Sequence, residues 1–306
     1  MKEKRIVSFL PSATELIYEL GAKDRLHGVT HECDYPIDAK NKPRVIESVF
    51  DPENMSSKEI DEKICYLSEK GEDIYKLVQK NLKSAKPDLI ISQEICEVCS
   101  AYTNQVKKAV DILDNKPEIY SMSPHNIEGI LQSVKDISEI IGEKENGEKL
   151  IKVLNSKINN MREIQFAKKP KVLGIEWLNP FFTAGHWVPN MIEGAGGINM
   201  ITKSGEHSRK MGIEEIENAD PDVIILMPCG FGIDRTISEY EKYLEQDSRW
   251  NRLRAVKRDR VFVVDANSFF SKPSIRVFTG IEILGKILHP DLFLKLEVPS
   301  NSFLKI

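Results

Sequence analysis

The sequence of 306 residues lacks several features that would identify a class of protein at once. No apolar run is long enough for a membrane helix or a secretory signal peptide, because the charged start at Met1–Arg5 leads directly into a short apolar segment. The chain has 43 Lys and Arg against 47 Asp and Glu, and this balance argues against nucleic acid or an anionic membrane as the main partner. We therefore expect a cytoplasmic protein, or a trimmed form of an exported or cell-surface one.

Cysteine and catalytic motifs are also scarce. Five cysteines in a chain of this length form an odd set, so we expect reduced thiols and no disulfide framework. The sequence has no Gly-x-Ser-x-Gly elbow, no glycine-rich phosphate loop and no His-Glu-x-x-His helix. His31-Glu32-Cys33 carries the side chains of a thiol-dependent enzyme, but on an extended segment Glu32 faces away from the other two. We expect a binding protein and not an enzyme, with a Cys/His-dependent enzyme as the alternative.

Short β-branched runs alternate with helical stretches along the chain, which is typical of parallel sheets covered by helices. One continuous helix is predicted from Asn146 to about Phe166, and its twenty residues would form a stiff spine roughly 30 Å long. The sequence thus predicts an α/β fold of two Rossmann-like lobes with mainly parallel sheets, joined by a single long helix. The predicted parts are an N-terminal lobe over 1–142, an interlobe spine helix over 143–169 and a C-terminal lobe over 170–306.

Local signals predict where some of the helices begin. Ser12 with Glu15, and Thr236 with Glu239, have the Ser/Thr-x-x-Glu spacing of a capping box. The residues from about Lys58 to Lys83 are predicted as an inserted helical region.

The most informative stretch runs from Glu176 to Gly197, where a predicted strand leads into a loop and then a helix. Four aromatic residues and one histidine fall within the eleven residues from Trp177 to Trp187. Large flat side chains with polar edges are typical of a pocket for a bulky planar ligand. In open α/β sheets ligands bind beyond the carboxyl ends of the strands, and the helix that follows the first strand offers backbone N–H groups there.

Several segments, taken in order along most of the chain, resemble the cobalamin-binding proteins of the vitamin B12 ABC importers. These proteins belong to the helical-backbone class of substrate-binding proteins. The segments that carry the resemblance are Ser8-Phe-Leu-Pro-Ser-Ala-Thr-Glu-Leu16, Asp34-Tyr-Pro36, Lys86-Pro-Asp-Leu-Ile-Ile91, Asn179-Pro-Phe-Phe-Thr-Ala-Gly185, Gly196-Gly-Ile-Asn199, and Phe269-Phe270 ahead of Ser274-Ile-Arg276.

The resemblance implies that the ligand is cobalamin or a related corrinoid, held in the interlobe cleft without a catalytic cofactor. It also implies acidic residues that dock on a permease, for which Glu59 and Glu193 are the nearest matches. The expected partner is an ABC-importer permease or a cytoplasmic corrinoid enzyme, with the protein itself a monomer. The candidate ligand-binding residues are Ser12, Ala13, Thr14, His31, Tyr35, Glu94, Trp177, Phe181, Phe182, His186, Trp187, Phe231, Phe269 and Phe270.

Thiols and imidazoles in the same loops go beyond what a corrin needs, and they suit soft or borderline metals. The candidate metal ligands are His31, Cys33, Cys96, Cys99, His186 and Cys229. Three interpretations stay open. In the first, His186 or His31 coordinates the cobalt of a corrinoid. In the second, the ligand is another metal chelate, such as haem or an iron-siderophore, or a metal ion. In the third, the cysteines only pack the floor of the pocket.

Overall fold

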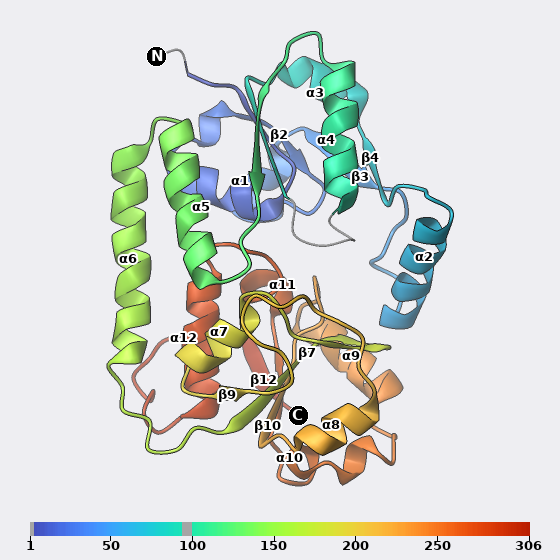
Figure 1. Cartoon of the computed structure of the whole chain (residues 1–306), viewed down its shortest axis with the longest axis vertical. Helices are drawn as coiled ribbons and strands as arrows, with labels where there is room; N and C mark the ends of the chain where they lie inside the picture. The colour runs from blue at the N-terminus through green and yellow to red at the C-terminus, as the bar shows by residue number, and fades with distance from the viewer. Residues whose placement is uncertain (1–2, 94–99) are drawn as a thin grey trace. The chain divides into compact units, whose positions relative to one another are not determined.

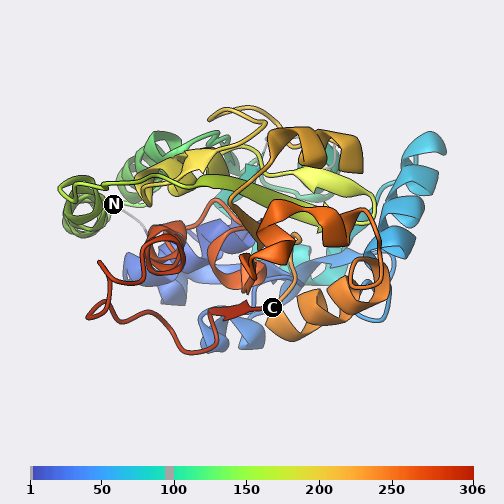
Figure 2. The ribbon, with the colours of Figure 1, turned by 90° about the horizontal axis from the view of Figure 1, so that it is seen from below.

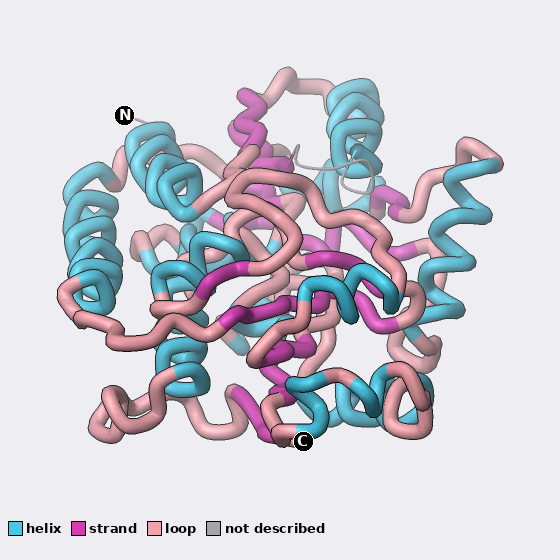
Figure 3. Tube along the Cα trace, turned by 60° about the horizontal axis from the view of Figure 1, so that its bottom comes forward, coloured by secondary structure: helices cyan, strands magenta, loops and turns pink. Residues whose placement is uncertain are grey.

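The structure is a computed structural model that describes residues 3–93 and 100–306. It is an α/β protein with two six-stranded sheets, and the strands alternate with helices along the chain (Figures 1 and 3). The predicted fold class is therefore confirmed. Internal contacts divide the chain into two compact units. Unit 1 comprises residues 1–54, 62–124 and 128–153, and unit 2 comprises residues 55–61, 125–127 and 154–306.

The sheet of unit 1 has the strand order β4-β3-β2-β1-β5-β6. All neighbouring strands run parallel except β4, which pairs antiparallel with β3. Parallel strands end at the same edge of a sheet, so the loops after β1, β2 and β5 meet there. The strands are β1 (Ile6–Ser8), β2 (Leu26–Thr30), β3 (Arg44–Ser48), β4 (Tyr75–Leu77), β5 (Leu89–Gln93) and β6 (Glu118–Met122).

The helices of the first half include one correction to the sequence prediction. The expected helical region from Lys58 to Lys83 is interrupted, because α2 ends at Glu69 and β4 follows it. Gly71 has a φ of 66°, and the turn around it ends the helix. The helices are α1 (Pro11–Glu19), η1 (Lys23–Arg25), η2 (Ile37–Asn41), α2 (Ser57–Glu69), α3 (Gln79–Ala85), α4 (Ser100–Ile112) and α5 (Ile127–Ile140).

The sheet of unit 2 has the order β12-β11-β10-β7-β8, and the short strand β9 also pairs with β7. Strands β7, β10 and β11 are parallel, whereas β8 and β12 are antiparallel to their neighbours. The carboxyl tail thus ends as an edge strand, drawn in red beside the marked C-terminus in Figure 2. The strands are β7 (Lys171–Leu178), β8 (Phe181–Thr183), β9 (Ile198–Asn199), β10 (Val223–Leu226), β11 (Val261–Val264) and β12 (Phe303–Lys305).

The helix predicted from Asn146 to about Phe166 corresponds to α6, which runs from Lys144 to Arg162 and so ends earlier than predicted. Internal contacts assign the part of α6 up to Val153 to unit 1 and the part from Leu154 to unit 2. They also assign residues 55–61 and 125–127 to unit 2, although the sequence on both sides of each segment belongs to unit 1. The remaining helices are α7 (Val188–Gly194), α8 (Ile213–Ala219), α9 (Ile233–Tyr243), η3 (Trp250–Arg252), α10 (Arg254–Lys257), α11 (Ala266–Phe269) and α12 (Val277–Leu288).

Both predicted capping boxes are wrong. Helix α1 begins at Pro11 with Leu10 as its N-cap and no side-chain cap, because proline is suited to the first helical position and places Ser12 inside the helix. Helix α9 has Gly232 as its N-cap, and the Thr236 hydroxyl donates to the Gly232 carbonyl oxygen at 2.9 Å.

The capping box of this chain lies at the start of α2 instead. The amide and the hydroxyl of Ser56 donate to one carboxylate oxygen of Glu59 at 2.8 and 2.6 Å, and the Glu59 amide lies 3.4 Å from the Ser56 hydroxyl. These contacts satisfy donors that the first turn of a helix leaves without intrahelical partners.

A buried carboxylate fixes residues 55–61 within unit 2. Glu239, on α9, is only 6% exposed and accepts hydrogen bonds from the amide of Ser57, at 3.0 Å, and from its hydroxyl. The Ser57 carbonyl accepts from Trp177 Nε1 at 3.0 Å, and Arg235 donates to the Met55 carbonyl at 2.9 Å. Both backbone groups of Ser57 are thereby satisfied by side chains from elsewhere in unit 2.

We expect Glu239→Ala to lower the free energy of unfolding by about 1–3 kcal/mol, because it leaves the Ser57 donors without an acceptor. Glu241→Ala, an exposed change in the same helix, is the matched control and is expected to stay within about 0.5 kcal/mol. Urea unfolding followed by circular dichroism compares the two. Equal stabilities would show that the Ser57–Glu239 contact does not hold the segment.

Candidate functional site

The candidate site of unit 2 is built on the turn that follows β8, where the backbone approaches another loop very closely. A Cβ atom added at Gly185 would lie 2.5 Å from the Ser208 amide nitrogen and 2.8 Å from the Glu206 carbonyl oxygen. Only glycine fits at that separation. The next residue, His186, has a φ of 54°, which is uncommon for a residue with a side chain.

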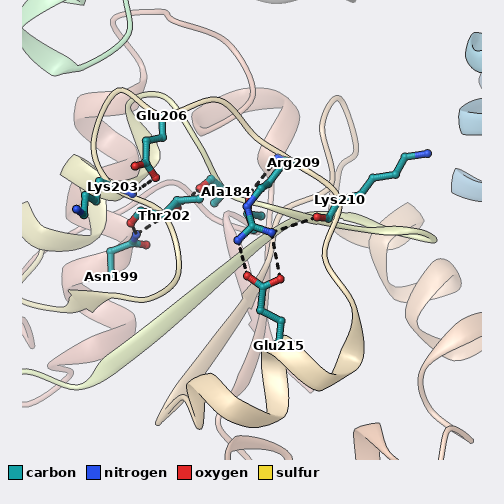
Figure 4. Close-up of polar contacts among 9 residues, drawn as sticks. Ala184, Asn199, Thr202, Lys203, Glu206, Arg209, Lys210 and Glu215 are labelled. Carbon is teal, nitrogen blue, oxygen red and sulfur yellow. Dashed lines mark hydrogen bonds and ion pairs between the residues drawn. The ribbon is translucent and has the colours of Figure 1, made fainter.

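Hydrogen bonds join the turn over residues 184–187 to the loop over residues 199–212. The His186 amide donates to the Glu206 carbonyl at 2.6 Å, and the Gly205 amide donates to the His186 carbonyl at 2.9 Å. The Thr202 hydroxyl donates to the Ala184 carbonyl at 2.5 Å (Figure 4). The two segments therefore form one bonded structure.

The 199–212 loop has its own internal supports. Asn199 Nδ2 donates to the Thr202 carbonyl at 2.6 Å, and the Lys203 amide donates to a Glu206 carboxylate oxygen at 2.8 Å (Figure 4). At the far end Arg209 makes a two-pronged ion pair with Glu215. These hydrogen bonds hold the pKa of Glu215 below its ordinary value.

Three histidines meet beside this turn. The ring centre of His186 lies 5.0 Å from that of His207 and 6.1 Å from that of His125, and His125 and His207 are 5.6 Å apart. Burial, with smaller contributions from His207 and His125, lowers the pKa of His186 to about 4, so its imidazole is neutral at pH 7. Its Nδ1 atom is buried and has no hydrogen-bond partner among the described residues.

Sequence reasoning found only one member of this cluster. His186 was a candidate for both ligand and metal, whereas His125 and His207 were not singled out. The three residues come from three separate segments of the chain, and no sequence spacing relates them. The close approach at Gly185 and the hydrogen bonds between the two segments bring His186 and His207 together.

Two predicted ligand residues, Trp177 and Phe231, lie beside each other in unit 2, and Trp177 contacts the 55–61 segment. The rings of Trp177 and Phe231 lie 5.2 Å apart, and the guanidinium of Arg235 lies 3.7 Å above the Phe231 ring. Trp177 also donates to Ser57, as described above. Their rings thus have a packing role, and their role toward a ligand stays a prediction.

Other predicted aromatics of unit 2 are largely core. Trp187 is 5% exposed and donates from Nε1 to the Phe270 carbonyl at 2.8 Å, and Phe270 is 2% exposed. Phe269 is buried below the guanidinium of Arg276. Little of the surface of these rings is available to a ligand in this conformation. Truncating one of them is therefore expected to lower the stability of the fold, whatever it does to ligand binding.

The remaining two aromatics of this unit are half-buried. Phe181 stacks on Trp250 with ring centres 6.0 Å apart, and it packs against the hydrophobic core. Phe182 lies beneath the ammonium group of Lys210, whose nitrogen is 5.7 Å from the ring centre. Of the predicted aromatics in unit 2, Phe182 therefore keeps both accessible ring surface and a nearby cation.

In unit 1, the predicted residue Thr14, at the start of α1, contacts a buried thiol. The Cys33 sulfur lies 3.1 Å from the Thr14 hydroxyl and 3.6 Å from the Thr30 hydroxyl, and burial raises the pKa of Cys33. Ser12 and Ala13 are buried as well, and the Ser12 hydroxyl has no partner among the described residues. A buried, protonated thiol is a poor metal ligand.

The loop after β2 supplies the exposed candidates of unit 1. Tyr35 is 45% exposed, beside Ile37, which is also exposed. The His31 ring is half-buried against Tyr75, with ring centres 5.8 Å apart. Tyr35 is thus the predicted aromatic with the most accessible surface.

The predicted metal ligands differ in burial. Cys229 is exposed and Cys33 is buried, while Glu94, Cys96 and Cys99 lie outside the described residues. Over residues 3–93 and 100–306, no three His, Cys, Asp or Glu side chains are arranged, as they stand, to hold a metal ion.

The two predicted docking residues, Glu59 and Glu193, are both exposed. Hydrogen bonds from Ser56 lower the pKa of Glu59, so this carboxylate already has a local role as a capping residue.

Among the described residues, none of the helices has the length and apolar character needed to cross a membrane.

The chain is similar to a known protein family and to several known proteins. A family model described as "Periplasmic binding protein" matches residues 6–268. The "Uncharacterized ABC transporter substrate-binding lipoprotein YvrC" of Bacillus subtilis is 24% identical over 95% of this chain and 81% of its own length. A "Vitamin B12-binding protein" of Vibrio cholerae is 24% identical over 91% of this chain and 87% of its own. The structure of Staphylococcus aureus IsdE complexed with heme has a TM-score of 0.69 and 18% identity, covering 94% of this chain and 99% of that one.

These similarities test two expectations that were drawn from the sequence. The expected cytoplasmic address is wrong, because the matching family is one of periplasmic proteins and the Bacillus relative is named a lipoprotein. The expectation of a binding protein and not an enzyme is confirmed, because the family consists of substrate-binding proteins.

We expect Gly185→Ala to lower the free energy of unfolding by about 1–3 kcal/mol, because the added methyl group forces the 199–212 loop away from the turn. Gly194→Ala is the matched control, since its new Cβ would meet Ile281 at an ordinary 3.6 Å; we expect it to be neutral or to stabilise by up to about 1 kcal/mol. Thermal and urea unfolding measure both. If the two variants are equally stable, the close approach is not a constraint.

We expect Cys65 and Cys229 to react with iodoacetamide in the folded protein while Cys33 does not, because Cys33 is buried and the other two are exposed. Mass spectrometry of the labelled peptides assigns each thiol, and labelling in denaturant is the control for reactivity. Modification of Cys33 at the rate of Cys229 without denaturant would contradict its burial.

Proposed function

The chain belongs to the periplasmic binding protein family, and we propose that it is the substrate-binding component of an ABC importer whose ligand is cobalamin or a related corrinoid. The main support is the Vibrio relative named for vitamin B12, which aligns along nearly the whole chain. The sequence motifs that resemble the cobalamin-binding proteins point the same way. The protein would act outside the cytoplasm and deliver its ligand to a membrane permease.

The chemistry of the candidate residues suits such a ligand. A corrinoid has a broad apolar ring with polar amide groups at its rim, so it needs flat side chains together with a few hydrogen-bonding groups. Tyr35 in unit 1 and Phe182 in unit 2 are accessible aromatics. His186, on the loop after β8, adds an imidazole that is neutral at pH 7.

Haem is the second candidate ligand, and the histidine is the observation that favours it. A neutral imidazole is a common axial ligand of haem iron, and His186 meets that requirement through its lowered pKa. The fold is shared with the haem complex of IsdE. We rank haem second because the motif resemblance and the alignment along most of the chain both lead to vitamin B12-binding proteins.

Titration of the purified, metal-stripped protein separates the two ligands. We expect cyanocobalamin and cobinamide to bind with measurable heat at one ligand per chain, and haemin to bind weakly. The visible spectrum, recorded in the same titration, reports whether a protein group ligates the metal. Absence of heat with both corrinoids, together with tight haemin binding and a shifted Soret band, would replace the corrinoid with haem.

We expect Tyr35→Ala to weaken corrinoid binding by about 1–3 kcal/mol, because it removes an accessible aromatic surface from the loop after β2. Tyr66→Ala is the matched control, since Tyr66 on α2 is 52% exposed and contacts only Lys63 and Lys70 among the ring interactions of the described residues. Calorimetric titration of both variants makes the comparison. An affinity loss that is the same in both would remove Tyr35 from the site.

The proposed docking residues, Glu59 and Glu193, need an assay of binding to the permease, separate from the titration with ligand. Glu193→Gln is the cleaner change, because Glu59 also caps α2. A substitution at Glu193 or at Glu59 is not expected to alter ligand affinity.

A further inference from the structure

The three-histidine cluster of unit 2 has a geometry that a flat macrocycle does not require. We propose that His125, His186 and His207 form a binding site for one divalent transition-metal ion of the cobalt, nickel, copper and zinc series. This site goes beyond the proposed function, and it rests on the geometry of unit 2 alone. Imidazole is a preferred ligand for all of these ions.

The spacing of the rings is the first argument. A metal ion bonded to an imidazole nitrogen at about 2.0–2.1 Å lies roughly 3.2 Å from the ring centre, so two rings on one tetrahedral ion have centres about 5 Å apart. The observed separations are 5.0, 5.6 and 6.1 Å. Three imidazoles thus already surround one point at close to the separation that coordination needs.

Ring rotation is an adjustment that the proposed site needs. As they stand, the three side chains do not all turn a nitrogen toward a common point. The terminal torsion of histidine is broad and roughly two-fold, so rotation about it is inexpensive. Its axis passes close to the ring centre, and rotation therefore turns the nitrogens while the ring centres stay nearly in place. The separations of the ring centres, which rotation leaves nearly unchanged, are therefore one condition for binding an ion that the cluster already meets.

The backbone keeps two of the three ligands in place. The close approach at Gly185 and the hydrogen bonds between His186 and residues 205–206 fix the turn against the loop that carries His207. Glu176 supports the same junction, because its carboxylate accepts from the Gly185 amide at 3.3 Å and from the Ser208 hydroxyl. A site built on such a support loses little conformational entropy when the ion binds.

An unsatisfied atom is the second, independent argument. Nδ1 of His186 is buried and has no hydrogen-bond partner among the described residues, and leaving such a group unpaired costs free energy. A bond to a metal from this nitrogen would relieve that cost. The nearby carboxylates of Glu176 and Glu206 already accept hydrogen bonds, so three histidines would leave one position for water or an exchangeable ligand.

The test is calorimetric titration of the chelator-treated full chain with ZnCl₂ and NiCl₂. We expect one ion per chain, and we expect His207→Ala and His125→Ala each to weaken binding at least about tenfold. His27→Ala is the matched control and should bind as the parent does, because this half-buried histidine on β2 belongs to unit 1. Unchanged binding in both cluster variants, or no stoichiometric binding by the parent, would overturn the proposal.

Two further measurements prevent a misleading result. Circular dichroism and urea unfolding establish that each variant is folded, and His207→Asn serves if His207→Ala is not. The Co²⁺-loaded protein reports its ligands by absorption, since a sulfur-to-cobalt charge-transfer band would place the ion on cysteines and contradict the histidine site. Corrinoid titration of the same variants is scored separately, so failure of the metal site and failure of the proposed ligand are distinguishable.

Discussion

The close contact between Gly185 and the backbone of residues 206–208 is the constraint on which the candidate site depends. A single added methyl group would collide with the amide of Ser208, so the turn and the loop fit together only with glycine at this position. That fit, reinforced by hydrogen bonds in both directions, sets His186 beside His207. It turns two loops, which are ordinarily the mobile parts of an α/β protein, into a support for side chains.

A second constraint acts through a buried carboxylate. Glu239 accepts two hydrogen bonds from Ser57 and so fixes residues 55–61 within unit 2. Trp177 donates a hydrogen bond to the same segment, and the Phe231 ring lies beside Trp177. Two aromatic residues that the sequence predicts as ligand contacts therefore have a packing role in the fold. A ligand contact would be compatible with that role, because an aromatic ring has two faces and an edge.

The sequence predicted the architecture better than the site. Alternating strand and helix patterns led to two α/β lobes and to helix α6, because these patterns are local and repeated. Strand β4 was missed, because it lies inside the predicted helical region from Lys58 to Lys83 and a short edge strand has a weak local signal. The capping boxes failed where Pro11 and Gly232 decided the helix starts. His125 and His207 could not be found from spacing, because only tertiary contacts bring them to His186.

The central claim is the proposal that a corrinoid binds at loops that follow the carboxyl ends of the strands. Amide hydrogen exchange with and without cyanocobalamin tests this claim most directly, because it locates binding without substitutions. The account predicts slower exchange in residues 31–37 and 184–187 and no change in α8 or in strand β12. Protection confined to other segments, or no protection at saturating ligand, would contradict it.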